Sequence, residues 1–153
     1  MDAAPWSTLS LPGPWQHQAA EWSDPSHEII VRGDIAIPSH WVGHDLIVSL
    51  GKIDDSDHTY WNGHRIDVTE KKGPWPHNMP RVYHVPATVV TDTRAVLAVH
   101  LFDRANLYDR VWNGGFVGPA EEMWIRMREP GLYADDYRYD YVYGDDPYRY
   151  FNW

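Results

Sequence analysis

Two tryptophans of this sequence stand beside polar side chains in turn-rich segments, and this combination could bind a ligand. A pyranose ring presents C–H groups that pack against an aromatic face, while its hydroxyl groups bond to planar donors and acceptors such as Asp, Asn and Arg. The candidate carbohydrate-binding residues are Trp75, His77, Asn78, Asp103, Arg104, Trp112 and Asn113. For any single tryptophan, packing in a core is the alternative, especially for Trp15, Trp41 and Trp124.

A second candidate site is an acidic segment that holds Asp54, Asp55 and Asp57. Clustered carboxylates are the hard oxygen ligands that calcium prefers, although the spacing here differs from that of an EF-hand loop. We predict Asp54 and Asp55 as ligands of a structural calcium ion, with capping of their own backbone amides as the alternative. Asp57 opens a core strand, so we assign it to the framework and expect a cation such as Arg81 to compensate its charge. We expect no required cofactor.

Signatures of catalysis are absent or weak. The sequence has no Gly-x-Ser-x-Gly elbow, and its Asp-x-x-His matches at 24–27 and 55–58 arise easily by chance. The nine histidines include the pairs His40/His44 and His58/His64, but neither pair has a third zinc ligand at recognisable spacing. A glycosidase needs two carboxylates flanking the scissile bond, and so acidic a chain offers many pairs, so the residues alone leave this reaction open.

The elements that position these residues are predicted to be β-strands. Runs rich in β-branched and aromatic residues, separated by turn formers, cover 29–37, 46–50, 57–61, 64–68, 81–85, 95–102 and 122–127. The Asn62-Gly63 pair predicts a type I′ hairpin, since that turn needs positive φ at both central residues. In the run at 95–102, Leu97, Val99 and Leu101 alternate toward a core. We find no convincing amphipathic helix, so the fold class is an all-β antiparallel sandwich or barrel.

If successive strands run antiparallel, their connections fall at two unlike ends. The connections at 38–43, 62–63 and 86–93 share one end, which we call the compact end. The longer connections at 14–27, 51–56, 69–80 and 104–120 share the other, the long-loop end, and hold Trp15, Trp22, Trp75 and Trp112. Because loops on a rigid scaffold often carry function, the long-loop end is the predicted binding end.

The chain is predicted to form one sandwich over residues 1–128, followed by a Tyr-rich extension over 129–153 that packs on the same domain. With 153 residues it has the size of a single domain with a sizeable core. Tyrosine at every second position from Tyr137 to Tyr143 predicts an extended strand with its rings on one face. We favour a packing or edge-covering role for this strand over a stacking platform.

Composition limits the partners. The net charge of −9 and the scattered basic residues argue against nucleic acid and against an anionic membrane surface. No apolar run approaches the roughly 20 residues of a membrane helix, and residues 1–5 lack the features of a signal peptide. The absence of cysteine removes disulfides and thiolate chemistry. Nine Trp and ten Tyr exceed the usual content of such a core, so some rings are expected to face solvent or a ligand.

Several ordered motifs resemble one known family of domains. The first of these motifs is Leu-Pro-Gly-Pro-Trp at 11–15, and residues 50–63 read Leu-Gly-Lys-Ile-Asp-Asp-Ser-Asp-His-Thr-Tyr-Trp-Asn-Gly. Further matching segments are 36–43, 81–86, 96–103 and the glycine-rich 114–118. Together they resemble the jelly-roll sugar-binding domain of family 2 glycoside hydrolases, which is related to the module inside sialate O-acetylesterases. The resemblance extends from about residue 6 to residue 127.

The resemblance implies a galactose-binding-like β-sandwich, a fold that often holds a structural calcium ion, with catalysis in another domain. We therefore predict a non-catalytic carbohydrate-binding module that accompanies a polysaccharide-degrading enzyme. Its expected partners are an oligo- or polysaccharide and the catalytic domain of an extracellular or periplasmic parent protein. Two alternatives stay open: a structural domain that braces a glycosidase or esterase catalytic domain, and a small hydrolase in its own right.

Overall fold

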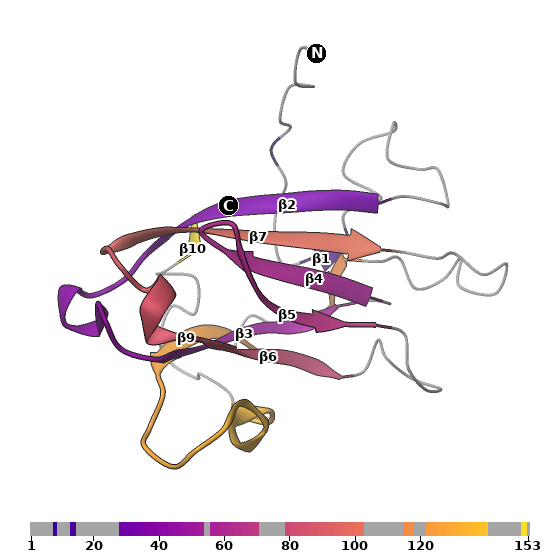
Figure 1. Ribbon diagram of the computed structural model, residues 1–153. Coiled ribbons are helices and arrows are strands. Elements are labelled where there is room, and N and C mark those ends of the chain that lie inside the picture. Colours follow the sequence, from indigo (N-terminus) through magenta and orange to yellow (C-terminus); the bar gives the residue numbers. More distant parts are fainter. Residues whose placement is uncertain are drawn as a thin grey trace, which may run out of the picture.

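Two antiparallel β-sheets face each other in the molecule (Figure 1). The computed structural model describes residues 8, 13–14, 28–53, 56–70, 79–102, 115–117, 122–140 and 151–152. The β3 sheet has the order β1 (Gly13–Pro14), β8 (Gly115–Val117), β3 (Leu46–Ile53) and β6 (Pro80–Val85), and β9 (Met123–Met127) also pairs with β3. The β7 sheet has the order β10 (Phe151–Asn152), β2 (Glu28–Ala36), β7 (Arg94–Phe102), β4 (Ser56–Trp61) and β5 (His64–Thr69). The predicted all-β antiparallel sandwich is confirmed.

Helical structure among the described residues is limited to short 3-10 turns. The turns that lie wholly within these residues are η2 (Ser39–Trp41), η4 (Ala87–Val89) and η6 (Ala134–Tyr137), and Glu122 also has 3-10 conformation. The same part of the chain contains no helix with the length and apolar character needed to span a membrane. Strands therefore supply the framework, as the short β-rich runs of the sequence predict.

The main core lies between the two sheets and follows the period-2 alternation of strand side chains. Leu97, Val99 and Leu101 of β7 are buried there, as predicted, while His100 is half-buried on the opposite face. The strand β3 departs from simple alternation, because almost all of it is buried. Leu46, Val48, Leu50 and Ile53 of this strand belong to the main core. Ile47 belongs to a second apolar cluster with Val82, Trp124 and Tyr137.

The segment after β9 forms the outer part of this second cluster. Tyr137 of η6 packs with Trp124 of β9, and their ring centroids are 6.1 Å apart. The predicted extended strand beginning at Tyr137 is wrong over its described part, since residue 137 ends a 3-10 helix and is 3% exposed, while Tyr139 is 72% exposed. Two hydrogen bonds stabilise the 3-10 helix instead of a strand. Asp136 Oδ2 accepts from the backbone N–H of Tyr133 at the start of the helix, and Tyr137 Oη accepts from the backbone N–H of Glu129. Residues 141–150 lie outside the described residues.

The compact end, on the left of Figure 1, is held together by hydrogen bonds of its turns to one another and to β7. Asn62 and Gly63 have φ angles of 48° and 80°, which confirms the predicted hairpin. Asn62 also ties this hairpin to β7, because its backbone N–H donates to Val96 O and its Oδ1 accepts from Val96 N, both at 2.8 Å. The next two turns are joined by a bond of 2.8 Å from Gly43 N to Val90 O. The three compact connections therefore share one end, as predicted.

We expect Gly63→Ala to lower the free energy of unfolding by roughly 1–2 kcal/mol. The added Cβ would meet no atom within 4 Å, so the effect would come from the positive φ of 80° alone. Urea denaturation would measure the change. His64→Ala, at the exposed neighbouring position, is the matched control and should change stability by less than about 0.5 kcal/mol. Equal stability of Gly63→Ala and the unaltered chain would contradict the turn geometry.

Candidate functional site

The described strand ends converge at the long-loop end. Phe102 pairs with Glu28 on one side and with Ser56 on the other, and Asp57 pairs with Thr69. In the facing sheet, Lys52 pairs with Pro80. The chain therefore leaves β3, β5 and β7, and enters β2, β4 and β6, at one end of the sandwich.

Every predicted site residue belongs to the connections at this end. Trp75, His77, Asn78, Asp103, Arg104, Trp112 and Asn113 all lie outside the described residues. What the structure describes is the scaffold around them: Asp103 directly follows the last residue of β7, and Asn78 stands two positions before β6. The sugar-binding assignment of these side chains thus stays a prediction.

A buried ion pair joins the two sheets at the long-loop end. Arg81 Nε of β6 donates to Asp57 Oδ1 of β4 at 2.8 Å, and the two side chains are 1% and 0% exposed. The other guanidinium nitrogens donate to backbone carbonyls, Nη1 to Met79 at 2.7 Å and Nη2 to Ile53 at 3.0 Å. One arginine thereby fixes the start of β6 and the end of β3 relative to β4.

Hydroxyl groups from both sheets complete the shell of Asp57. Thr59 Oγ1 donates to Asp57 Oδ2 at 2.8 Å, and Tyr83 Oη lies 2.8 Å from both carboxylate oxygens. Because an ionised carboxylate only accepts hydrogen bonds, Tyr83 is the donor toward Asp57. Tyr83 Oη in turn accepts from Thr69 Oγ1 at 2.7 Å. A continuous chain of bonds therefore runs from β5 through β6 to β4.

Electrostatics explains why this network needs all its members. Burial raises the pKa of Asp57, while the Arg81 charge and the hydrogen bonds of Thr59 and Tyr83 oppose that rise. Burial also raises the pKa of Tyr83, and the neighbouring Asp57 carboxylate adds to the effect. Both effects favour the protonated phenol, which is the form that donates to Asp57. The prediction that Asp57 is a framework residue paired with Arg81 is confirmed.

The predicted calcium ligands Asp54 and Asp55 also lie outside the described residues. The described oxygen groups on either side of them, Ile53 O and the Asp57 carboxylate, already accept bonds from Arg81. Within the described ranges, no three His, Cys, Asp or Glu side chains come together as a metal-ligand set. Calcium binding remains a prediction that rests on Asp54 and Asp55 alone.

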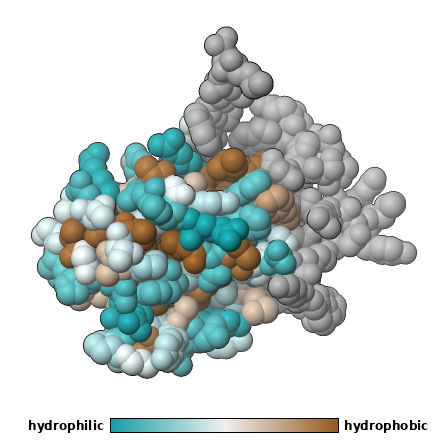
Figure 2. Space-filling model, in the orientation of Figure 1, coloured by the Kyte–Doolittle hydropathy of each residue, from teal (hydrophilic) through white to brown (hydrophobic). Residues whose placement is uncertain are grey.

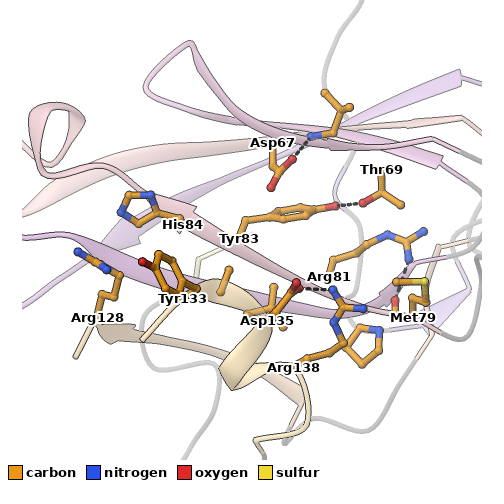
Figure 3. A pocket seen from close by; sticks show the side chains of 14 residues that line it. Asp67, Thr69, Met79, Arg81, Tyr83, His84, Arg128, Tyr133, Asp135 and Arg138 are labelled. Atoms are coloured by element: carbon orange, nitrogen blue, oxygen red, sulfur yellow. Dashed lines mark hydrogen bonds and ion pairs between the residues drawn. The ribbon is translucent and has the colours of Figure 1, made fainter. Parts of the chain in front are cut away.

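A groove opens on the side of the sandwich, between β5, β6 and η6 (Figure 3). Its volume is about 630 Å³. Aromatic, cationic and acidic side chains share its lining, which includes Asp67, Thr69, Met79, Arg81, Tyr83, His84, Arg128, Tyr133, Asp135 and Arg138. Figure 3 shows His84, Arg128 and Tyr133 toward one end, with Met79 and Arg138 toward the other.

Asp45 organises the His84 end of this groove. Its Oδ1 accepts from Ala87 N at 2.7 Å, and its Oδ2 accepts from Arg128 Nη2 at 3.0 Å. His84 Nε2 lies 3.4 Å from Asp45 Oδ1. The hydrogen bond from Ala87 is the largest cause that lowers the pKa of Asp45; partial burial opposes it, and Arg128 and His84 reinforce it.

The sequence analysis did not predict this groove. Its walls come from residues 67–69, 79–84 and 128–138, which only the fold brings together. One local signal was present: Asp135 and Asp136 follow Tyr133, and acidic residues in a first turn favour the start of a helix. That signal would have located η6, although not the strands that face it.

Comparisons with known proteins bear on the fold. No family model matches the sequence, and no curated protein sequence matches it. Among solved structures, the chain is similar to a β-D-glucuronidase of Dictyoglomus thermophilum, with 14% identity, a TM-score of 0.56 and coverage of 86% of this chain. It is also similar to the Bifidobacterium dentium β-glucuronidase complexed with coumarin-3-O-glucuronide, with 20% identity, a TM-score of 0.52 and coverage of 76% of this chain. The match spans 21% and 19% of those two chains, and it shows a shared fold.

We expect Arg81→Met to destabilise the protein by about 3–5 kcal/mol, because it leaves the Asp57 carboxylate buried without its cation. If that variant does not fold, Tyr83→Phe supplies a milder test with an expected loss of about 1–3 kcal/mol. Denaturant unfolding would measure both. Arg65→Met, at an exposed position of β5, serves as the control. A loss below about 1 kcal/mol for the first two variants would show that the network is dispensable.

A pH-dependent effect is expected for Asp45→Asn. A carboxyl group whose folded pKa is lowered stabilises the fold above its unfolded pKa, near 3.8, and this contribution disappears as the pH falls through the folded pKa. The variant should be less stable by about 1–2 kcal/mol near pH 6, and the difference should shrink below pH 4. Urea titrations across this range would measure it, with the exposed Asp92→Asn as the control. A difference that is constant with pH would refute the assignment.

Proposed function

We propose that this chain is a non-catalytic accessory domain of a glycan-degrading enzyme and that it contacts carbohydrate at its long-loop end. The observation that carries this proposal is the match of a sandwich of this size to about a fifth of two β-glucuronidase chains. Most of each enzyme lies outside the match, which is consistent with catalysis elsewhere. The motifs at 11–15 and 50–63, which resemble family 2 glycoside hydrolases, point in the same direction.

The described scaffold supports the choice of end. Two of the turns at the compact end are bonded to each other and the third is bonded to β7, whereas the Asp57–Arg81 pair holds the strand ends from which the long connections depart. Rigid strand ends are what a binding site on loops needs. In this proposal Trp75 and Trp112 stack on the sugar, and the polar partners are His77, Asn78, Asp103, Arg104 and Asn113.

We also propose that residues 129–153 belong to the same folding unit. Two contacts support this: Tyr137 packs on Trp124, and Phe151 pairs with Ile35 at the edge of the β7 sheet. The proposed partners are an oligo- or polysaccharide and the catalytic domain of the parent protein. An extracellular or periplasmic parent fits this role, because polymeric glycans are met outside the cell.

A bracing domain without glycan affinity is the alternative. Large hydrophobic residues that remain exposed in the described part of the chain could contact a catalytic domain: Ile30, Met79, Met127, Tyr133 and Tyr139. They come from different strands and turns, and Figure 2 shows the apolar residues of the viewed face in patches between hydrophilic ones. A large domain interface favours one contiguous apolar patch, so glycan binding remains the first proposal.

Glycan binding can be tested by isothermal titration and affinity electrophoresis with plant, algal and host polysaccharides. We expect modest affinity for at least one glycan, reduced about tenfold or more in Trp75→Ala and Trp112→Ala, since each variant removes one stacking face. Trp41→Phe, at the compact end, is the control and should bind as the unaltered chain does.

Absence of binding across the whole panel would refute the carbohydrate-binding role and favour the bracing domain. Turnover of aryl glycosides or acetyl esters by the purified chain would refute the non-catalytic assignment. Binding that survives both tryptophan changes would move the site away from the predicted residues.

A further inference from the structure

We infer that the groove between β5, β6 and η6 is a separate binding site for a short neutral oligosaccharide. Its volume of about 630 Å³ falls within the range of small-ligand sites, about 300–1,000 Å³. The lining residues used in the argument below all belong to the described part of the chain. The inference stands on this groove alone and does not depend on the long-loop end.

An exposed aromatic ring supplies the stacking surface. Tyr133 is 73% exposed, although it directly precedes a 3-10 helix whose own tyrosine, Tyr137, is buried. The backbone of Tyr133 is held by a bond of 2.8 Å from its N–H to Asp136 Oδ2. A ring on an anchored backbone that is open to solvent offers a stacking face to the C–H groups of a sugar.

The charges of the groove select a neutral ligand. Each arginine that lines it already has a carboxylate partner: Arg81 pairs with Asp57, Arg128 with Asp45, and Arg138 with Asp135. An anion would therefore find no uncompensated arginine here, which disfavours phosphate or sulfate ligands. Sugar hydroxyl groups both donate and accept, so they match a lining that contains arginines as well as the carboxylates of Asp67 and Asp135.

Two further polar groups face the same space. Asp67 is exposed on β5, and its Oδ1 is engaged by Val68 N at 2.7 Å, while its second oxygen has no bond to another described residue. The side chain of His84 is 42% exposed; its Nε2 is buried 3.4 Å from Asp45 Oδ1, which leaves Nδ1 for a ligand. The free Asp67 oxygen and this imidazole nitrogen can each bond to a sugar hydroxyl group.

The sheet edges argue for a saccharide over a polypeptide strand. β5 and β6 end their respective sheets in the described strand order, so each presents backbone groups at an edge. A peptide could add to such an edge, but β5 carries exposed His64, Arg65 and Asp67, and its pairing with β4 shifts register between Thr59 and Tyr60. Charged side chains and bulges are the devices that block strand addition.

The test is an NMR titration of the full chain with neutral gluco-, manno-, galacto- and xylo-oligosaccharides. We expect amide shifts at Thr69, Tyr83 and residues 133–138 with at least one of these sugars. Tyr133→Ala should weaken this binding about tenfold, because it removes the stacking face. Tyr139→Ala is the matched control, since Tyr139 is equally exposed at 72% and does not line the groove.

The double variant Trp75→Ala/Trp112→Ala separates this inference from the proposed function. Groove shifts should persist in it, even if binding at the long-loop end is lost. The inference is overturned if millimolar oligosaccharide shifts no groove amide, if only uronic acid or sulfated sugars do so, or if an extended peptide displaces the sugar. Unchanged affinity in Tyr133→Ala would also overturn it, and the amide spectrum of that variant would verify that it is folded.

Discussion

The buried Asp57–Arg81 pair is the interaction on which the rest of the structure depends. It connects β4 of one sheet to β6 of the other, and the same guanidinium holds the carbonyls of Ile53 and Met79. A carboxylate that is fully buried needs every partner, so the two sheets can approach only in the one arrangement that supplies them. Burial of the apolar core favours packing of the two sheets, but apolar contacts alone are compatible with several relative positions of the sheets. The polar network specifies one of these positions.

The two ends of the sandwich differ for physical reasons. At the compact end, backbone groups of the turns bond to one another, as Gly43 does to Val90 and Ile37 to Thr93. At the long-loop end, the side chains of Asp57 and Arg81 hold the described strand ends. Connections that start from such fixed points can vary in length and sequence without disturbing the core. This division explains how one sandwich can serve as a scaffold for loops that carry function.

The segment after β9 links stability to the groove. Arg126 stacks on the ring of Trp124 at 4.3 Å and pairs with Asp140 at 2.8 Å, and the Trp124 indole donates to Asp140 O at 3.2 Å. These contacts place η6 over the outer face of the β3 sheet. The same placement presents Tyr133 and Arg138 to the space beside β6, so the groove exists because the segment is anchored.

Local patterns in the sequence determined the strands, the hairpin at Asn62-Gly63 and the framework role of Asp57, because alternation, turn chemistry and the cost of burying a charge act over a few residues. Only the tertiary structure decided the burial of Tyr137 against Trp124 and the existence of the groove. Alternating tyrosines predict a strand, yet burial of one ring against Trp124 and a side-chain bond to the Tyr133 backbone favour a helical turn. The groove joins residues 67–69 and 79–84 to residues 128–138, which follow more than 40 residues later, and short-range patterns carry no information about such pairs.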